Sequence, residues 1–467
     1  MAASAQAIER LRQYLRELKP ASRAMLVTEL ERGLVRGQEM PGAELVLQEL
    51  RRVVRDSGRQ SKRPGNLARL FFQPLEPFLV DDAADHRHCG RIARVSLEPI
   101  WQWISRDLMP GEVKAISDDV SQAVTDNDTD KAENLARDFQ DRVIVRMREA
   151  LQVADADPKA MRRLAGQVGT PRARQDIESI LGALEARDTL AAINNELPGH
   201  IRNLESGPLQ NIKILLDKQL RERPGVLLYA LVLVMNRLAA RWQLIRFAID
   251  AAGSDIASRV GETPYAVAVT MVLAETERMV SELKSDLKSG GGIAVSALLK
   301  DIHDAARGVR TELDLSADSP WARQLAALRT DISNILKNEI ESMPGRVRRL
   351  LRPRPASDIA PGSMLSRTDV EETAALIEFV DACRLYAGEL AISEMTQRAY
   401  SELQQSLENG TQPLIDALRH AGEDERGFRK SQAEAAIRFC RLVFGPEHAA
   451  VIAKAVDVAE HSERKSA

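Results

Sequence analysis

Apolar residues recur at spacings of three and four along nearly the whole chain, which is the period of an amphipathic helix. Polar and charged residues fill the positions between them. The first stripe comprises Ile8, Leu11, Leu15 and Leu18. We predict a helix there and two more at 22–36 and 42–55, which together make a small antiparallel bundle. A basic amphipathic helix on a membrane surface is the alternative for the first twenty residues.

The middle of the chain repeats this pattern between clear breakers. Three or four helices are expected from 110 to 187, because acidic or Gly-Pro loops interrupt the pattern at 125–130, 155–158 and 168–171. The segment 225–252 is apolar nearly all round for three turns, which is typical of a central helix surrounded by others. A buried strand followed by a helix is the alternative there.

Long helices are expected in the last third of the chain. Two are predicted at 264–288 and 293–315, and a third begins at Ser319 and Pro320. The apolar spacing of this third helix is heptad-like but too short to identify a coiled coil, so we expect an antiparallel hairpin, with dimerisation as the alternative. A capping box, Thr368 to Glu371, opens a helix that could extend to about Asn409. Two further helices are expected at 426–444 and 446–462.

These elements predict an all-α protein built of multi-helix bundles with long antiparallel helical hairpins and no significant sheet. The breaker-rich and linker-like stretches suggest five parts. We expect a small N-terminal helical bundle at 1–58, a helical region with an aromatic-rich core at 66–190, a central helical bundle with long hairpins at 191–352, a linker at 353–366, and a C-terminal helical bundle at 367–463.

The composition agrees with this class. The chain has 467 residues, of which 44% are hydrophobic, 28% charged and 4% aromatic, so a core of helices packed on helices suits it better than a β-sandwich. A net charge of −3 argues against a surface built wholly for nucleic acid. Three dispersed cysteines favour a reducing compartment, and no apolar run could span a bilayer or form a signal peptide. We therefore expect a cytoplasmic location.

Motifs that could carry chemistry are weak. The cluster Asp85, His86, His88 and Cys89 lacks zinc-ligand spacing and favours a polar loop. The acids at 126, 128 and 130 begin like a calcium loop, but Lys131 stands where such a loop needs glycine. The glycines at 290–292 favour a helix stop, and Cys383 and Cys440 lie on apolar helical faces. We predict no catalytic residue, no metal ligand and no cofactor.

The most specific feature is an arginine cluster between Met343 and Ser357, a stretch that contains no acid. Its members are Arg346, Arg348, Arg349, Arg352 and Arg354. Guanidinium groups could bind phosphate of nucleic acid or of lipid headgroups, or an acidic partner protein. Alternatively they cap a helix C-terminus, pair with acids of the neighbouring bundle or keep a linker solvated.

Two functions follow from these observations. The first is a non-enzymatic cytoplasmic interaction or scaffolding protein that binds other proteins through helical faces, with homo-oligomerisation as an option. The alternative is a peripheral binder of anionic surfaces, either membrane or nucleic acid phosphate, through the arginine cluster. An enzyme whose site is assembled from distant helices stays open as a third.

Overall fold

The computed structural model describes residues 46, 66–81, 89–221, 223–288 and 292–461. Apart from residue 46, the predicted N-terminal bundle at 1–58 lies outside these residues. Contacts between Cα atoms divide the chain into two compact units: unit 1 comprises 1–73 and 101–153, and unit 2 comprises 74–100 and 154–467. This division has no boundary at 353–366, and the five predicted parts stay predictions.

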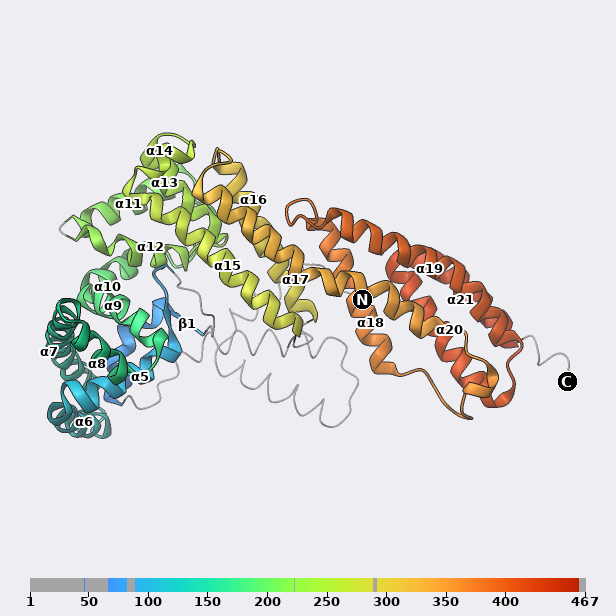
Figure 1. Ribbon diagram of the computed structural model, residues 1–467, viewed down its shortest axis with the longest axis horizontal. Helices are drawn as coiled ribbons and strands as arrows, with labels where there is room; N and C mark the ends of the chain where they lie inside the picture. Colours follow the sequence, from blue (N-terminus) through green and yellow to red (C-terminus); the bar gives the residue numbers. More distant parts are fainter. Residues whose placement is uncertain (1–45, 47–65, 82–88, 222, 289–291, 462–467) are drawn as a thin grey trace. The chain divides into compact units, whose positions relative to one another are not determined.

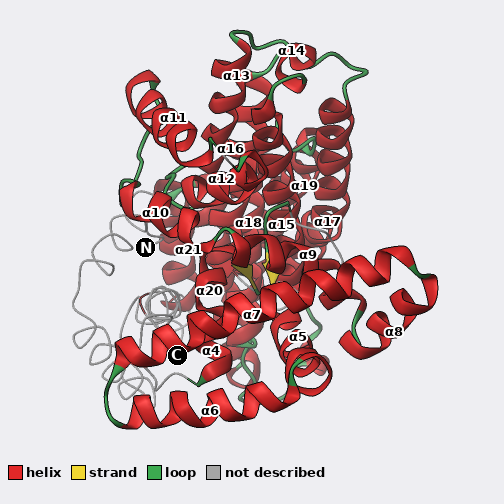
Figure 2. Ribbon diagram, turned by 90° about the vertical axis from the view of Figure 1, so that its left-hand side faces the viewer, coloured by secondary structure: helices red, strands yellow, loops and turns green. Residues whose placement is uncertain are grey.

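Helices make up almost all of the described structure, as Figure 2 shows. The described residues contain one small sheet, in which strand β1 (Leu79–Val80) pairs in parallel with β2 (Ile92–Ala93). The predicted all-α class is therefore confirmed. The arrangement of the long helices as antiparallel hairpins stays a prediction.

Unit 1 has a core of aromatic rings packed edge-to-face or tilted against one another. Phe71 and Phe72 on α4 pack against each other with ring centroids 4.9 Å apart, and Phe71 also contacts Trp101 and Phe139 at 5.7 and 5.8 Å. Gln140 adds a buried hydrogen bond of 2.7 Å to the carbonyl of Phe71. The helices of the unit are α4 (Leu67–Phe72), the end of α5 (Leu97–Trp103), η3 (Ile104–Leu108), α6 (Pro110–Thr125) and most of α7 (Thr129–Ala156).

Unit 2 begins with the small sheet and a set of short helices. A buried carboxylate, Asp176 on α9, connects the two: it accepts hydrogen bonds from the backbone N–H of Ala93 at 3.0 Å and from the Ser96 hydroxyl at 2.7 Å. The elements are η1 (Gln73–Phe78), η2 (Arg94–Ser96), α8 (Pro158–Val168), α9 (Pro171–Glu185), α10 (Arg187–Glu196) and α11 (Ser206–Leu220). The breaks between α6, α7, α8 and α9 fall where the sequence predicts them.

The single central helix predicted at 225–252 is wrong. The structure has three helical pieces there after the turn η4 (Pro224–Val226): α12 (Leu227–Met235), η5 (Arg241–Ile245) and α13 (Arg246–Ala252). Between α12 and η5, the backbone leaves the helix and pairs with Ile201, whose N–H donates to Arg237 O at 2.8 Å and whose carbonyl accepts from Ala239 N–H at 2.9 Å. This tertiary bridge replaces intrahelical hydrogen bonds, so the periodic pattern does not reveal it.

Seven long helices complete the described part of unit 2; two short pieces precede them and a third lies between α17 and α18 (Figure 1). The long helices are α15 (Val267–Lys288), α16 (Gly292–Glu312), α17 (Pro320–Leu351), α18 (Arg367–Tyr386), α19 (Ser393–Arg419), α20 (Glu423–Phe444) and α21 (Pro446–His461). The short pieces are α14 (Ala257–Gly261), η6 (Pro264–Ala266) and η7 (Ala356–Asp358).

The helix predicted from Thr368 to about Asn409 is also wrong. It breaks between α18 and α19 at a turn in which Ala391 has a left-handed φ of 57°, and α19 continues through Gly410 and Pro413. The cap lies two residues earlier than predicted, because the Ser366 hydroxyl accepts from the Asp369 N–H at 3.3 Å.

A close approach between η5 and α16 depends on a glycine. Gly308 is buried on α16, and a Cβ there would lie under 3.0 Å from three atoms of the Trp242 indole. Because the indole ring is rigid, it cannot avoid this Cβ by moving only a few of its atoms. The position therefore requires glycine for packing, although glycine weakens a helix interior.

We predict that Gly308→Ala lowers the free energy of unfolding by about 1–3 kcal/mol, the usual range for overpacking a core. The matched control is Gly410→Ala, at a helical position where a Cβ meets nothing within 4 Å. There the better helix propensity of alanine is expected to raise stability by up to about 1 kcal/mol. Urea unfolding of both variants measures this, and equal effects would contradict the packing role of Gly308.

Candidate functional site

The arginine cluster begins on the last turns of α17, and the helix period divides these turns into two faces. Met343, Pro344, Val347 and Leu351 are buried, whereas Arg348 and Arg349 are exposed, as is Arg352 just after the helix end. Arg346 lies between the faces and is half-buried. The buried face fixes the rotation of the helix, so Arg348 and Arg349 are directed to solvent.

The helix-end arginines have no acidic partner. Within the part of the chain that the structure describes, the side chains of Arg346, Arg348, Arg349 and Arg352 make no ion pair and no hydrogen bond. The nearest acid on the exposed face of α17, Glu341, is paired with Arg398 of α19 at 2.8 Å. The pairing with neighbouring acids that the structural alternative expects is therefore not seen for these four residues.

Beyond α17, the chain lies along α20. Arg354 places its guanidinium carbon 5.1 Å from the centroid of the Phe428 ring, a cation–π contact. The backbone carbonyls of Leu350 and Arg352 accept hydrogen bonds from Gln432 at 2.9 and 3.1 Å. Farther along, the N–H of Leu365 donates to the Ser431 hydroxyl at 2.9 Å. The segment 353–366 is thus attached to α20 at both ends.

A second cluster of charged side chains lies where η5 packs on α15, around one buried carboxylate. The carboxylate of Glu275, whose side chain is 6% exposed, is paired with Arg241 of η5 and, at 3.1 Å, with Arg278 of its own helix. Arg278 also contacts Glu282 at 3.0 Å. Arg91, which directly precedes β2, donates to Asn236 Oδ1 at 2.9 Å and to Pro77 O at 3.2 Å, and it acts on Glu275 through its charge.

These charges shift one another's pKa. Burial alone would raise the pKa of Glu275, but the charges of Arg241, Arg278 and Arg91 outweigh it and lower the pKa to about 2. For Arg91, burial lowers the pKa to about 10, against the attraction of Glu275 and with the repulsion of the other two arginines. The carboxylate is therefore ionised at every physiological pH and serves as a fixed counter-charge.

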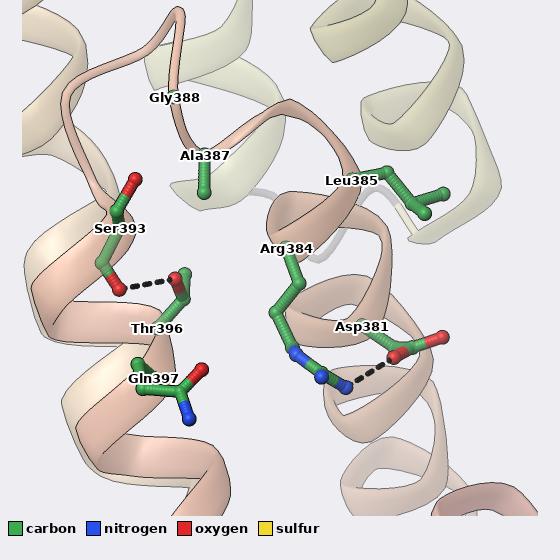
Figure 3. Close-up of a pocket in the computed structure, with 8 residues that line it drawn as sticks. All are labelled: Asp381, Arg384, Leu385, Ala387, Gly388, Ser393, Thr396 and Gln397. Atoms are coloured by element: carbon green, nitrogen blue, oxygen red, sulfur yellow. Dashed lines mark hydrogen bonds and ion pairs between the residues drawn. The ribbon is translucent and has the colours of Figure 1, made fainter.

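A pocket of about 420 Å³ lies where α18 ends and α19 begins (Figure 3). Its charged side chains are already engaged: Arg384 pairs with Asp381 at 3.1 Å and lies 3.7 Å from the centroid of the Tyr400 ring. The arginine cluster does not line it. The lining residues are Asp381, Arg384, Leu385, Ala387, Gly388, Ser393, Thr396 and Gln397.

The weaker sequence candidates are distributed as follows. Cys383 and Cys440 are buried, as predicted, and burial raises the pKa of both thiols. Asp128 caps α7 by accepting from the Lys131 N–H at 3.0 Å. Asp85, His86, His88 and residues 289–291 lie outside the described residues. Among the residues that are described, no three potential metal-ligating side chains come together, and no helix is long and apolar enough to cross a membrane.

Sequence reasoning missed two features. One is Glu275, for which the available signal is an acid inside the otherwise apolar start of a long helix. The other is a second acid-free basic stretch, 158–175, in which Lys159, Arg162 and Arg163 share the exposed face of α8. Counting acids as well as bases along the chain would have found this stretch.

Comparison of the chain with protein-family models, with curated protein sequences and with solved structures finds no match.

We predict that Glu275→Gln lowers the free energy of unfolding by about 3 kcal/mol, because removal of the buried carboxylate leaves Arg91 and Arg278 without their shared counter-charge. Glu282→Gln is the control, since Glu282 is 35% exposed and pairs with the same Arg278. Its loss is expected to cost at most about 1 kcal/mol. Urea unfolding at neutral pH compares them, and similar losses would show that the Glu275 pairing adds little.

The same carboxylate gives a pH dependence of known sign. Its pKa falls from the usual 4.5 to about 2 on folding, so its contribution is complete above pH 4.5 and is lost as the pH falls through 2. The stability difference between the natural chain and Glu275→Gln is therefore expected to shrink from pH 4.5 to pH 2. Urea midpoints across this range measure the difference, and a constant difference would contradict the lowered pKa.

Proposed function

We propose that the chain is a non-enzymatic cytoplasmic interaction protein that binds anionic phospholipid surfaces through the arginine cluster. The observation that carries the proposal is the exposed, acid-free set of arginines at the end of α17. A guanidinium group that has no carboxylate partner is free to bind phosphate, and it does not lose its charge at any physiological pH.

Helix stabilisation explains only part of the cluster. Arg348 and Arg349 lie in the last turn of α17, where positive charge complements the helix dipole. Arg354 lies beyond the helix end and gains nothing from the dipole, which decays within the last turn. The dipole also does not account for the lack of acids from 343 to 357.

An exposed apolar side chain on the segment that follows α17 favours lipid over nucleic acid. Met364 is 69% exposed and precedes Leu365, whose backbone is attached to Ser431, one helical turn from the Phe428 ring beneath Arg354. An exposed thioether chain on the segment that also carries Arg354 suits the headgroup boundary of a bilayer, which accepts apolar side chains. Binding to the phosphates of nucleic acid does not require an exposed apolar side chain such as that of Met364.

The broader expectations from the sequence stay predictions. Binding of other proteins through helical faces, homo-oligomerisation and the lack of an enzymatic activity belong to the proposal, and none of them rests on a contact described above.

We predict that changing Arg348, Arg349 and Arg352 together to Gln lowers partitioning onto anionic vesicles about 100-fold, since each arginine near such a surface contributes about 1 kcal/mol. Co-sedimentation with phosphatidylcholine vesicles containing about 30 mol % phosphatidylserine measures it. Raising the salt concentration to about 1 M should weaken binding of the natural chain in the same way.

The control removes the same charge elsewhere. Arg259, Arg323 and Arg438 are exposed and separate from the cluster, and changing them to Gln should leave binding within a few-fold. Equal losses in both triple variants would mean that net charge, not the cluster, matters. Binding to duplex DNA but not to vesicles would replace lipid by nucleic acid as the partner.

A further inference from the structure

The arginine cluster is divided between two supports. Arg346, Arg348 and Arg349 belong to the rigid helix α17, which is packed on its neighbours through a buried face. Arg352 and Arg354 follow the last helical residue, where the backbone is extended and the chain from 352 to 358 is exposed. The geometry of α17 therefore does not set the positions of Arg352 and Arg354, and other contacts must do so.

Two polar side chains of α20 provide this placement. Gln432 is completely buried and donates to the carbonyls of both Leu350 and Arg352, so it bridges the last turn of α17 and the first extended residue. Arg429 is 6% exposed and donates through Nη2 to the carbonyl of Arg354. Both contacts are made to the backbone and so do not use the guanidinium groups of Arg352 and Arg354.

The side chains that make these two contacts also bury polar atoms at a cost in stability. Arg429 Nη1 and Gln432 Oε1 are buried and have no hydrogen-bond partner among the described residues. Arg429 is held in place by its pairing with Glu425 at 3.0 Å. Two apolar residues at these positions would leave no buried polar atom without a partner, but they could not donate a hydrogen bond to a backbone carbonyl. The arrangement therefore favours a defined backbone path over maximal stability.

We propose that Gln432 and Arg429 are positioning residues that hold Arg352 and Arg354 beside the helical arginines and so make the cluster one preorganised surface for anionic phospholipid. This inference rests on the proposed function. Without the two contacts, the pair would have to be ordered when the surface binds, and this ordering would reduce its contribution to affinity.

A double-mutant cycle tests the inference. In the natural chain, changing Arg352 and Arg354 together to Gln should weaken vesicle binding about 25-fold, or about fivefold per arginine. In a Gln432→Met background, the same double change should weaken it less than about fivefold. Changing Arg348 and Arg349 to Gln should have the same effect in both backgrounds. A general loss of structure would reduce both pairs alike, so the difference between pairs is specific to positioning.

Ser431→Ala is the matched control, because Ser431 holds the same segment at its far end, at Leu365. In that background, the Arg352 and Arg354 pair should keep its full effect. Should Gln432→Met fail to unfold cooperatively, Arg429→Met replaces it, since this change removes the contact to Arg354 and keeps an unbranched apolar stem. Arg429→Lys, which retains a donor, is expected to restore part of the effect.

The outcomes separate the two proposals. If the arginine pairs have no effect on vesicle binding in the natural chain, the proposed function fails. If both pairs matter but the effect of Arg352 and Arg354 is unchanged by Gln432→Met, the cluster binds lipid and the positioning inference alone is overturned.

Discussion

One buried carboxylate organises the polar interior of unit 2. Glu275 on α15 is paired with Arg241 of η5 and with Arg278 of its own helix. Its negative charge also attracts the positive charge of Arg91. Desolvation of an isolated carboxylate would be prohibitive, and without it the three guanidinium groups around it would repel one another. Each charge is thus tolerable because the others are present. Around this group, Arg91 and Asn236 share the carbonyl of Pro77, which ties the strand segment to the end of α12.

Local patterning predicts helices well where their ends are set by local chemistry. Asp157 and Thr170 cap α8 and α9 with their own side chains and are followed by proline, so the breaks there can be read from neighbouring residues. The breaks at 236–240 and 387–392 have different causes. The first is a backbone bridge to Ile201, a residue of another element, and the second depends on a left-handed Ala391. Neither leaves a mark in the hydrophobic period, so both segments were expected as single helices.

The candidate site shows the same limit. Five arginines without an acid are visible in the sequence, and the helix period even indicates which of them share a face. What holds the extended part of the cluster is not visible, because Arg429 and Gln432 are polar residues about 80 positions away in the chain. Buried polar residues that serve another segment look like solvent-facing ones in a helical pattern. For the same reason, Glu275 looks like an ordinary surface acid.

The contact between Arg91 and Asn236 has a consequence for biosynthesis. The two residues are 145 positions apart, and the intervening chain includes 101–153, which belongs to unit 1. During translation from the N-terminus, the segment 74–100 emerges long before its polar partners on α12 and α15. Residues 101–153, whose aromatic partners on α4 have already been made, can pack before that. The hydrogen bond from Arg91 to Asn236 can form only after α12 has been made, and Arg91 meets the charge of Glu275 only after α15 has been made, so closure of this long loop comes late in synthesis.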